Sequence, residues 1–240
     1  MAITRVQSAA MAIAPNQSSA EVSLPSAPAA GNLLVGVGHV TEENAAALTF
    51  TPPTTDSVLW STAVDVRETT ATHTAHLIIC YRADCGTANS FTLGVSAAVD
   101  ICWSVYEYSG AATSSPLHDT VSAVGNSTTA DTELLATHAG ELRICGIGNQ
   151  NNNAQDPWTY TGAFSLLEHE ATPNSTGAHR TRLSTHEWIG AADGNARVVA
   201  NPFSADRSWV AAIAAFKEPS AAAAAPPAAR RRRFAHLLVR

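Results

Sequence analysis

The sequence predicts an all-β fold, and three observations support this prediction. Short segments alternate between apolar and polar residues with the period of two that is typical of strands, and they are rich in β-branched and aromatic residues. Turn-forming residues separate these segments at short intervals. No segment before residue 218 combines the capping residues and the apolar spacing of a helix of useful length.

The predicted strands follow one another along the chain, each bounded by Gly, Pro, Asn, Asp or Ser. In the first half they are residues 22–24, 33–37, 58–60, 76–81, 91–95 and 101–108. After them, residues 116–121 indicate an edge strand and residues 126–129 a turn. Because 45% of the chain is hydrophobic and only 14% is charged, most of it is expected to fold around a core.

An internal repeat orders these strands. Residues 20–24 and 31–38 recur as residues 132–136 and 140–148, with an offset of 109 between Gly31 and Gly140. In the first half an aromatic residue, a turn and then Trp103 follow one another. The second half repeats this order, with Trp209 in the place of Trp103. We therefore expect residues 20–111 and 131–218 to be structurally equivalent.

Glycines recur within the repeated strand. Gly36-Val37-Gly38 and Gly146-Ile147-Gly148 are interpreted as equivalent positions, where strand twist or close sheet packing requires glycine. A phosphate-binding loop is not predicted, since neither run belongs to a phosphate-loop or dinucleotide motif.

Two arrangements satisfy the duplication. Both halves can interleave their strands in one two-sheet jelly roll of the concanavalin A-like type, or each half can form a separate immunoglobulin-sized sandwich. No proline-rich or charged linker separates the halves, which favours one β-sandwich domain over residues 1–218.

The composition changes after Glu218. Residues 219–229 form an Ala/Pro linker, and residues 230–240 form a basic and then apolar C-terminal arm. The arm is either a solvated tail, a nucleic-acid contact, or an extended arm that docks on a partner. The residues predicted to dock are Arg230, Arg231, Arg232, Arg233, Phe234, Leu237 and Leu238.

The charge distribution limits the partners. Residues 1–218 hold all 20 acidic and 9 of the 14 basic residues, a net charge of −11. Such a body repels phosphate, which argues against nucleic acid as its partner. The sequence contains no run of about 18 apolar residues, so no membrane span is predicted. Residues 1–15 lack the apolar region of a secretory signal.

Catalytic and metal sites are not predicted. Glu168 and Glu170 share a strand face but lack a third acid in register, so a solvated strand end is favoured over a glycosidase site. Glu107 is expected to point outward and to have no special role if Tyr106 and Tyr108 point inward. The four cysteines are expected to be buried thiols, although the sequence leaves open whether Cys80 and Cys102 pair. The histidines lack metal-ligand spacing, so no metal, no cofactor and no enzymatic activity are predicted.

One loop has a composition that suits a sugar ligand. Residues 149–160 combine amides with two aromatic rings, which can bind sugar hydroxyls and stack on a sugar ring. The candidate glycan-binding residues are Asn151, Asn152, Asn153, Trp158 and Tyr160.

Several motifs resemble a known group of proteins. GNLLV at 31–35, VYEYSGA at 105–111, SPLHDT at 115–120 and SWVAAIAAFKEP at 208–219 resemble concanavalin A-like jelly-roll proteins of tailed bacteriophages. These occur as accessory proteins on the tail or capsid surface of the virion, so the resemblance implies synthesis in the host cytoplasm and incorporation into the virion.

The leading functional hypothesis is therefore a non-enzymatic structural protein of a phage virion, either a minor tail protein or a capsid decoration protein. Its implied partners are other virion proteins and further copies of itself in a homo-oligomer, with host-surface adhesion as an additional role. The alternatives are a lectin-like carbohydrate-binding module that binds a host-surface glycan, and an exported glycoside hydrolase, which would need a pair of carboxylates.

Overall fold

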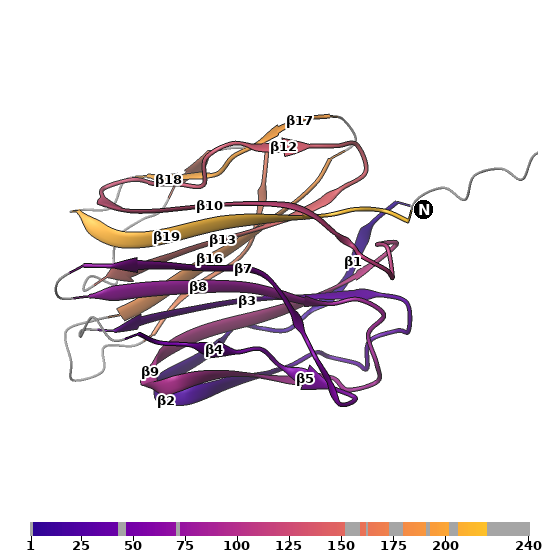
Figure 1. Ribbon diagram of the computed structural model, residues 1–240, viewed down its shortest axis with the longest axis horizontal. Helices are drawn as coiled ribbons and strands as arrows, with labels where there is room; N and C mark the ends of the chain where they lie inside the picture. Colours follow the sequence, from indigo (N-terminus) through magenta and orange to yellow (C-terminus); the bar gives the residue numbers. More distant parts are fainter. Residues whose placement is uncertain are drawn as a thin grey trace, which may run out of the picture.

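The structure is a computed structural model that describes residues 2–42, 47–70, 73–151, 159–161, 163–172, 180–190, 193–201 and 206–219. The described residues form strands, turns and loops, and no helix occurs among them. The predicted all-β class is thus confirmed, and Figure 1 shows the long strands running in roughly one direction across the molecule.

The first half of the chain forms one antiparallel sheet. Its strands lie in the order β1-β9-β3-β8-β7, and β2 and β4 also pair with β9. The bounds of these strands are β1 Thr4–Ser8, β2 Ala12–Ser23, β3 Leu33–Glu42, β4 Phe50–Thr51, β7 Ser61–Thr69, β8 Thr74–Arg82 and β9 Ser90–Ser109. A small hairpin, β5 (Thr54–Thr55) and β6 (Val58–Leu59), precedes β7.

The second half forms the opposing sheet. Its strands lie in the order β10-β19-β13-β16-β15. They are β10 Leu117–Ser127, β13 Leu142–Asn151, β15 Ser165–Ala171, β16 Arg180–Ile189 and β19 Arg207–Phe216. Five short strands form two further small sheets: β11 Ala130–Asp131, β12 Leu135–Thr137, β14 Thr159–Thr161, β17 Gly194–Ala196 and β18 Val199–Asn201.

The two sheets pack face to face, but the halves do not interleave. Neither main sheet combines strands from residues 20–111 with strands from residues 131–218, so the expected interleaving is wrong. The strands of each half hydrogen-bond to strands of the same half, even where they lie far apart in the sequence, as do β3 and β9 or β13 and β19. Each half therefore satisfies its own backbone hydrogen bonds without the strands of the other. The order β9-β3-β8-β7 corresponds to β19-β13-β16-β15, which agrees with the repeat in the sequence.

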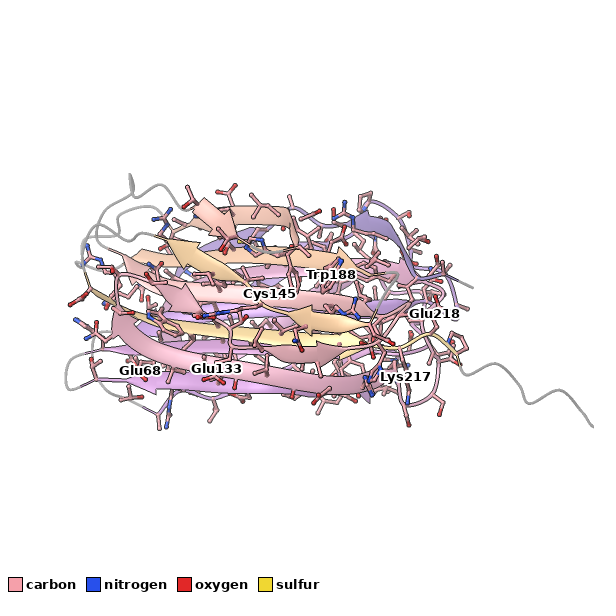
Figure 2. All side chains as sticks on the ribbon, turned by 90° about the horizontal axis from the view of Figure 1, so that it is seen from above. Glu68, Glu133, Cys145, Trp188, Lys217 and Glu218 are labelled. Atoms are coloured by element: carbon pink, nitrogen blue, oxygen red, sulfur yellow. The ribbon has the colours of Figure 1, made fainter. Side chains whose placement is uncertain are left out.

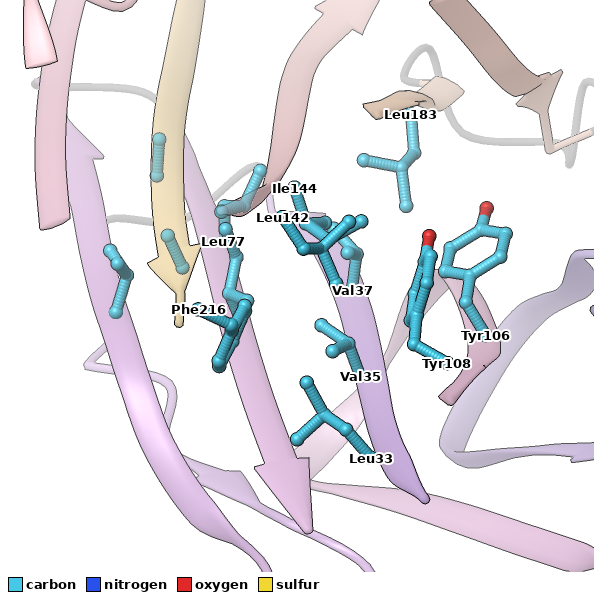
Figure 3. Close-up of a cluster of buried hydrophobic side chains, with 14 of the residues drawn as sticks. Leu33, Val35, Val37, Leu77, Tyr106, Tyr108, Leu142, Ile144, Leu183 and Phe216 are labelled. Carbon is cyan, nitrogen blue, oxygen red and sulfur yellow. The ribbon is translucent and has the colours of Figure 1, made fainter. Parts of the chain in front are cut away.

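Apolar side chains form three layers. The central cluster lies between the two sheets and takes residues from both, including Leu33, Leu77, Leu142 and Phe216 (Figure 3). A second cluster lies on the outer side of the first sheet, and a third on the outer side of the second sheet. Both sheets are therefore covered on both faces, which explains why the inner strands are apolar almost throughout.

The outer layers come mostly from short strands that were not predicted, from β2, of which only residues 22–24 were predicted, and from the long strand β9. Residues 91–95 and 101–108 belong to one strand of 20 residues, β9, whose first part pairs with the end of β2. In Figure 1 the short strands β12, β17 and β18 lie beyond β10 on one side, while β2, β4 and β5 lie on the other. The predicted edge strand at residues 116–121 is confirmed as part of β10.

The recurring glycines permit close packing, but on opposite sides of their sheets. A Cβ on Gly36 would lie 2.0 Å from the ring of Trp103 in the outer layer. A Cβ on Gly146 would lie 2.7 Å from Val37 Cγ1, between the sheets. The interpretation of these glycines as equivalent positions is therefore wrong: Leu33 matches Leu142, the glycines are out of step by one residue, and one residue reverses the face in a strand.

Candidate functional site

The predicted glycan-binding residues are only partly described. Asn152, Asn153 and Trp158 lie outside the described residues, and Asn151 is the last residue of β13. Tyr160 lies in β14, half-buried, with its ring edge-on against His186 at a centroid distance of 4.3 Å. The predicted docking residues Arg230 to Arg233, Phe234, Leu237 and Leu238 also lie outside the described residues.

Tyr160 belongs to a polar cluster on the outer face of the second sheet. Its hydroxyl lies 3.4 Å from His169 Nδ1, and Arg182 Nη2 lies 2.9 Å from His169 Nε2. Burial, with the positive charge of Arg182 as a smaller cause, lowers the pKa of His169 to about 4. Burial likewise lowers the pKa of His186 to about 3, so both rings are neutral at neutral pH.

Asn149 lies on the same face of β13 and is fully buried. Neither its Oδ1 nor its Nδ2 has a hydrogen-bond partner within the described part of the chain. No sequence pattern predicts this, because the alternation of β13 indicates which face a side chain occupies but not what covers it.

Glu168 joins the two sheets. Its Oε2 accepts hydrogen bonds from Ser104 Oγ at 2.8 Å and from Tyr106 Oη at 3.0 Å. Its Oε1 accepts one from the backbone nitrogen of Met11 at 3.1 Å. The expected solvated strand end is therefore wrong for Glu168, because a bulge between Leu166 and Glu168 lets β15 bring this carboxylate to β9. Glu170, two residues further on, is exposed.

Other hydrogen bonds continue this row along β9. Tyr108 Oη donates to Glu187 Oε2 at 2.9 Å, and Arg5 forms an ion pair with the same carboxylate at 3.2 Å. At the other end, Asp100 Oδ2 accepts from Thr172 Oγ1 at 2.7 Å. We call this row the inter-sheet seam: Asp100, Ser104, Tyr106 and Tyr108 on β9, with Glu168, Thr172, Thr185 and Glu187 opposite.

The seam holds its tyrosines in the donating form. Burial, and then the charge of Glu168, raises the pKa of Tyr106. Burial, and then the charge of Glu187, likewise raises the pKa of Tyr108. Its signal in the sequence is the even spacing of Asp100, Ser104, Tyr106 and Tyr108 along the chain. That spacing places them on one face, but it does not reveal the acceptors opposite.

Glu107 corrects another expectation. It does point away from the inter-sheet core, yet it is fully buried. Its Oε1 accepts hydrogen bonds from the backbone nitrogen of Ala29 at 2.8 Å and from Asn32 Nδ2 at 2.6 Å. The residues before β3 therefore fold over the outer face of the sheet, and this carboxylate holds them there.

A groove of about 440 Å³ lies beside the β5–β6 hairpin. It is near the end of the sandwich where Lys217 and Glu218 follow β19, because the Lys217 nitrogen donates to the carbonyl of Pro116, a lining residue (Figure 2). The lining consists of Val58, Leu59, Ser61, Tyr81, Arg82, Ala83, Asp84, Ser115 and Pro116.

The groove combines apolar and polar groups. Val58 and Leu59 are 47% and 57% exposed. The Tyr81 ring is fixed by an edge contact with Phe216, and Asp84 Oδ1 accepts from the backbone nitrogen of Gly31. Arg82 adds N–H donors at the end of β8. No local sequence pattern predicts this groove, because a hairpin, a strand end and the connection between the halves form it together.

The cysteines are buried and free. Cys80 belongs to the outer cluster of the first sheet and Cys102 to the central cluster, so these two do not pair. Burial raises the pKa of all four thiols, that of Cys85 to about 11, with the charge of Glu107 as a smaller cause for Cys85. These thiols are therefore poor nucleophiles at neutral pH.

Among the described residues, no group of three His, Cys, Asp or Glu side chains is placed to hold a metal ion. In the same part of the chain no helix has the length and apolar character needed to cross a membrane.

Comparisons with models of protein families, with curated proteins and with solved structures find no match for this chain.

Proposed function

We propose that this protein is a non-enzymatic structural component of a bacteriophage virion, on its tail or capsid surface. The observation that supports this best is the use of Glu168. A carboxylate on a sandwich strand is what a glycoside hydrolase would place toward its substrate. Here it accepts hydrogen bonds from the N-terminal segment and from β9, and so fastens the two sheets to each other.

Other carboxylates support the same proposal. Glu107 holds the segment before β3, and Glu187 binds both Tyr108 and Arg5. These acids serve the architecture of the body, as suits a protein whose role is to keep its shape in an assembly. Four short motifs resemble phage accessory proteins, and this resemblance is the reason for proposing that the assembly is a virion.

Sedimentation tests the proposal directly. A lysate from the native source would be separated on a density gradient, and mass spectrometry would follow this chain through the fractions. Co-migration with DNA-filled particles, at a fixed ratio to the major capsid protein, is expected. Recovery only in the soluble fractions would contradict the proposal.

The C-terminal arm offers a second test. Removing residues 219–240 is expected to abolish incorporation into particles while the body stays folded, because the arm is proposed to dock on another virion protein. The Arg240→Ala variant is the matched control and is expected to be incorporated normally. Full incorporation of the truncated chain would contradict the docking role.

The groove favours carbohydrate binding as a second candidate function. Its exposed aliphatic side chains and the Tyr81 ring suit the apolar face of a sugar, and Arg82 and Asp84 supply a donor and an acceptor for hydroxyl groups. This site differs from the loop at residues 149–160 that the sequence favours.

Three variants and one control separate these two locations. With purified host cell-wall polysaccharide as the probe, Leu59→Ser is expected to weaken binding at least fivefold if the groove is used. Trp158→Ala reports on the predicted loop in the same assay. Leu134→Ser, at a side chain that is 60% exposed outside the groove, is the control. Unchanged binding in both Leu59→Ser and Arg82→Gln would exclude the groove.

A further inference from the structure

The edges of the two main sheets differ in how they are protected against pairing with another chain. The edge strands β1, β2, β7 and β15 each contain a shift in register that interrupts the edge. In β10 the shift lies at the start, between Leu117 and Asp119. The eight residues Thr120–Ser127 then pair with β19 without interruption.

The same stretch also lacks the other devices that protect edges. Charged side chains, prolines and bulges normally keep edge strands from associating. β7 carries Asp65, Arg67 and Glu68, β15 carries Glu168 and Glu170, and β2 contains Pro15 and Glu21. Thr120–Ser127 contains neither a charge nor a proline.

The outer edge of this stretch has no strand partner among the described residues, although β7, β11 and β12 lie close to β10. β10 is the last strand of its sheet and pairs only with β19 in the described chain. Ser122, Val124 and Asn126 alternate along it as exposed residues, and Val124 is 39% exposed. Gly125 lets the strand lie close to the sheet, because a Cβ there would be 2.5 Å from the Trp209 ring.

We propose that Thr120–Ser127 of β10 pairs with the same segment of a second copy, antiparallel and about a two-fold axis. This would join two five-stranded sheets into one continuous sheet across a dimer. The inference rests on the proposed structural role, and it names the surface through which the protein would meet its own copy.

Charge argues that the occupant is a second copy. Residues 1–218 carry a net charge of −11, so most surfaces of two copies repel each other. A two-fold axis at β10 would place an uncharged stretch opposite itself. Small polar and aliphatic side chains would then meet across the new strand pair, and exposed backbone groups would gain hydrogen bonds.

The test is sedimentation equilibrium of the full purified chain. The unaltered protein is expected to be a dimer at micromolar concentration. Val124→Lys and Ser122→Lys are each expected to raise the dimer dissociation constant at least tenfold, because the two-fold axis would bring two positive charges together. Thermal melts would verify that both variants remain folded.

Val58→Lys is the matched control, since Val58 is similarly exposed but lies on the β5–β6 hairpin. It is expected to dimerise like the unaltered chain. A monomeric unaltered protein would overturn the inference, and so would lysine variants of β10 that dimerise as well as Val58→Lys. This measurement needs no virion, so its failure is distinguishable from failure of the proposed function.

Discussion

Equivalent aromatic residues of the two sheets differ by a hydroxyl group, which is present on Tyr108 and absent from Phe216. Leu33 lies opposite Tyr108 in the first sheet, and the equivalent Leu142 lies opposite Phe216 in the second. By the same match Tyr81 corresponds to Glu187. The hydrogen bond between Tyr108 and Glu187 therefore has an aromatic counterpart, the edge contact between Phe216 and Tyr81.

Removing the Tyr106 hydroxyl tests the contribution of the inter-sheet seam. Tyr106→Phe is expected to lower the free energy of unfolding by about 1–3 kcal/mol, because the buried hydroxyl bonds to a carboxylate. Urea denaturation measures this change.

Tyr81→Phe is the matched control. The Tyr81 hydroxyl makes no hydrogen bond within the described residues, and its loss is expected to change stability by less than about 0.5 kcal/mol. Equal effects of the two substitutions would contradict a stabilising seam.

His39 is a fully buried base between the sheets. Its Nδ1 lies 2.9 Å from the carbonyl oxygen of His76. Burial lowers its pKa to about 4, although hydrogen bonds to the backbone of His76 and Asn149 oppose the shift. His39 is thus neutral in the folded protein at neutral pH.

This pKa predicts a loss of stability in acid. The unfolded chain takes up a proton at His39 as the pH falls below about 6.5, whereas the folded chain does not do so until about pH 4. The contribution of His39 to the free energy of unfolding is therefore fully present above about pH 6.5. Between about pH 6.5 and about pH 4 it falls by about 1.4 kcal/mol per pH unit. Nuclear magnetic resonance titration should find the His39 ring neutral at pH 5, and a midpoint near 6.5 would refute the burial effect.

At the scale of elements, glycine sets how closely β13 approaches the first sheet. A Cβ on Gly148 would lie 2.4 Å from the His39 ring, and one on Gly146 would meet Val37 and Leu77. Both glycines lie in the backbone of a regular strand in a densely packed core, so neither β13 nor the side chains opposite it can move aside easily.

Gly148→Ala is therefore expected to destabilise the protein by about 1–3 kcal/mol through overpacking. Gly94→Ala is the comparison, because the nearest atom to its new Cβ, Thr51 Cβ, is 3.2 Å away and the cost should be smaller. Guanidinium denaturation of both variants makes the measurement. A Gly148→Ala variant as stable as Gly94→Ala would show that the sheets are not packed this tightly.

Alternation and turn residues were enough to predict most long strands of the first half, including β3, β8 and the two parts of β9. They did not predict that β9 continues between its two parts, because Ser96 to Asp100 carries no strong strand signal. The buried position of Glu107 was also missed, since the period of two gives the face of a sheet but not the segment that covers it. The groove depends on residues far apart in sequence, and no local pattern connects Leu59 with Pro116.

On the scale of the whole molecule, each half supplies one sheet, and the central core belongs to both. Leu77 and Val37 of the first half pack in the same cluster as Ile144 and Phe216 of the second (Figure 3). The inter-sheet seam adds hydrogen bonds across the same boundary. Neither half would bury its inner face without the other, so we expect the halves to unfold together.

Differential scanning calorimetry of the full chain shows whether the two halves unfold together. One shared core predicts a single transition in which the calorimetric enthalpy equals the van't Hoff enthalpy. Two resolved transitions, or a van't Hoff enthalpy of about half the calorimetric value, would mean that the halves unfold as separate units and do not share one cooperative core.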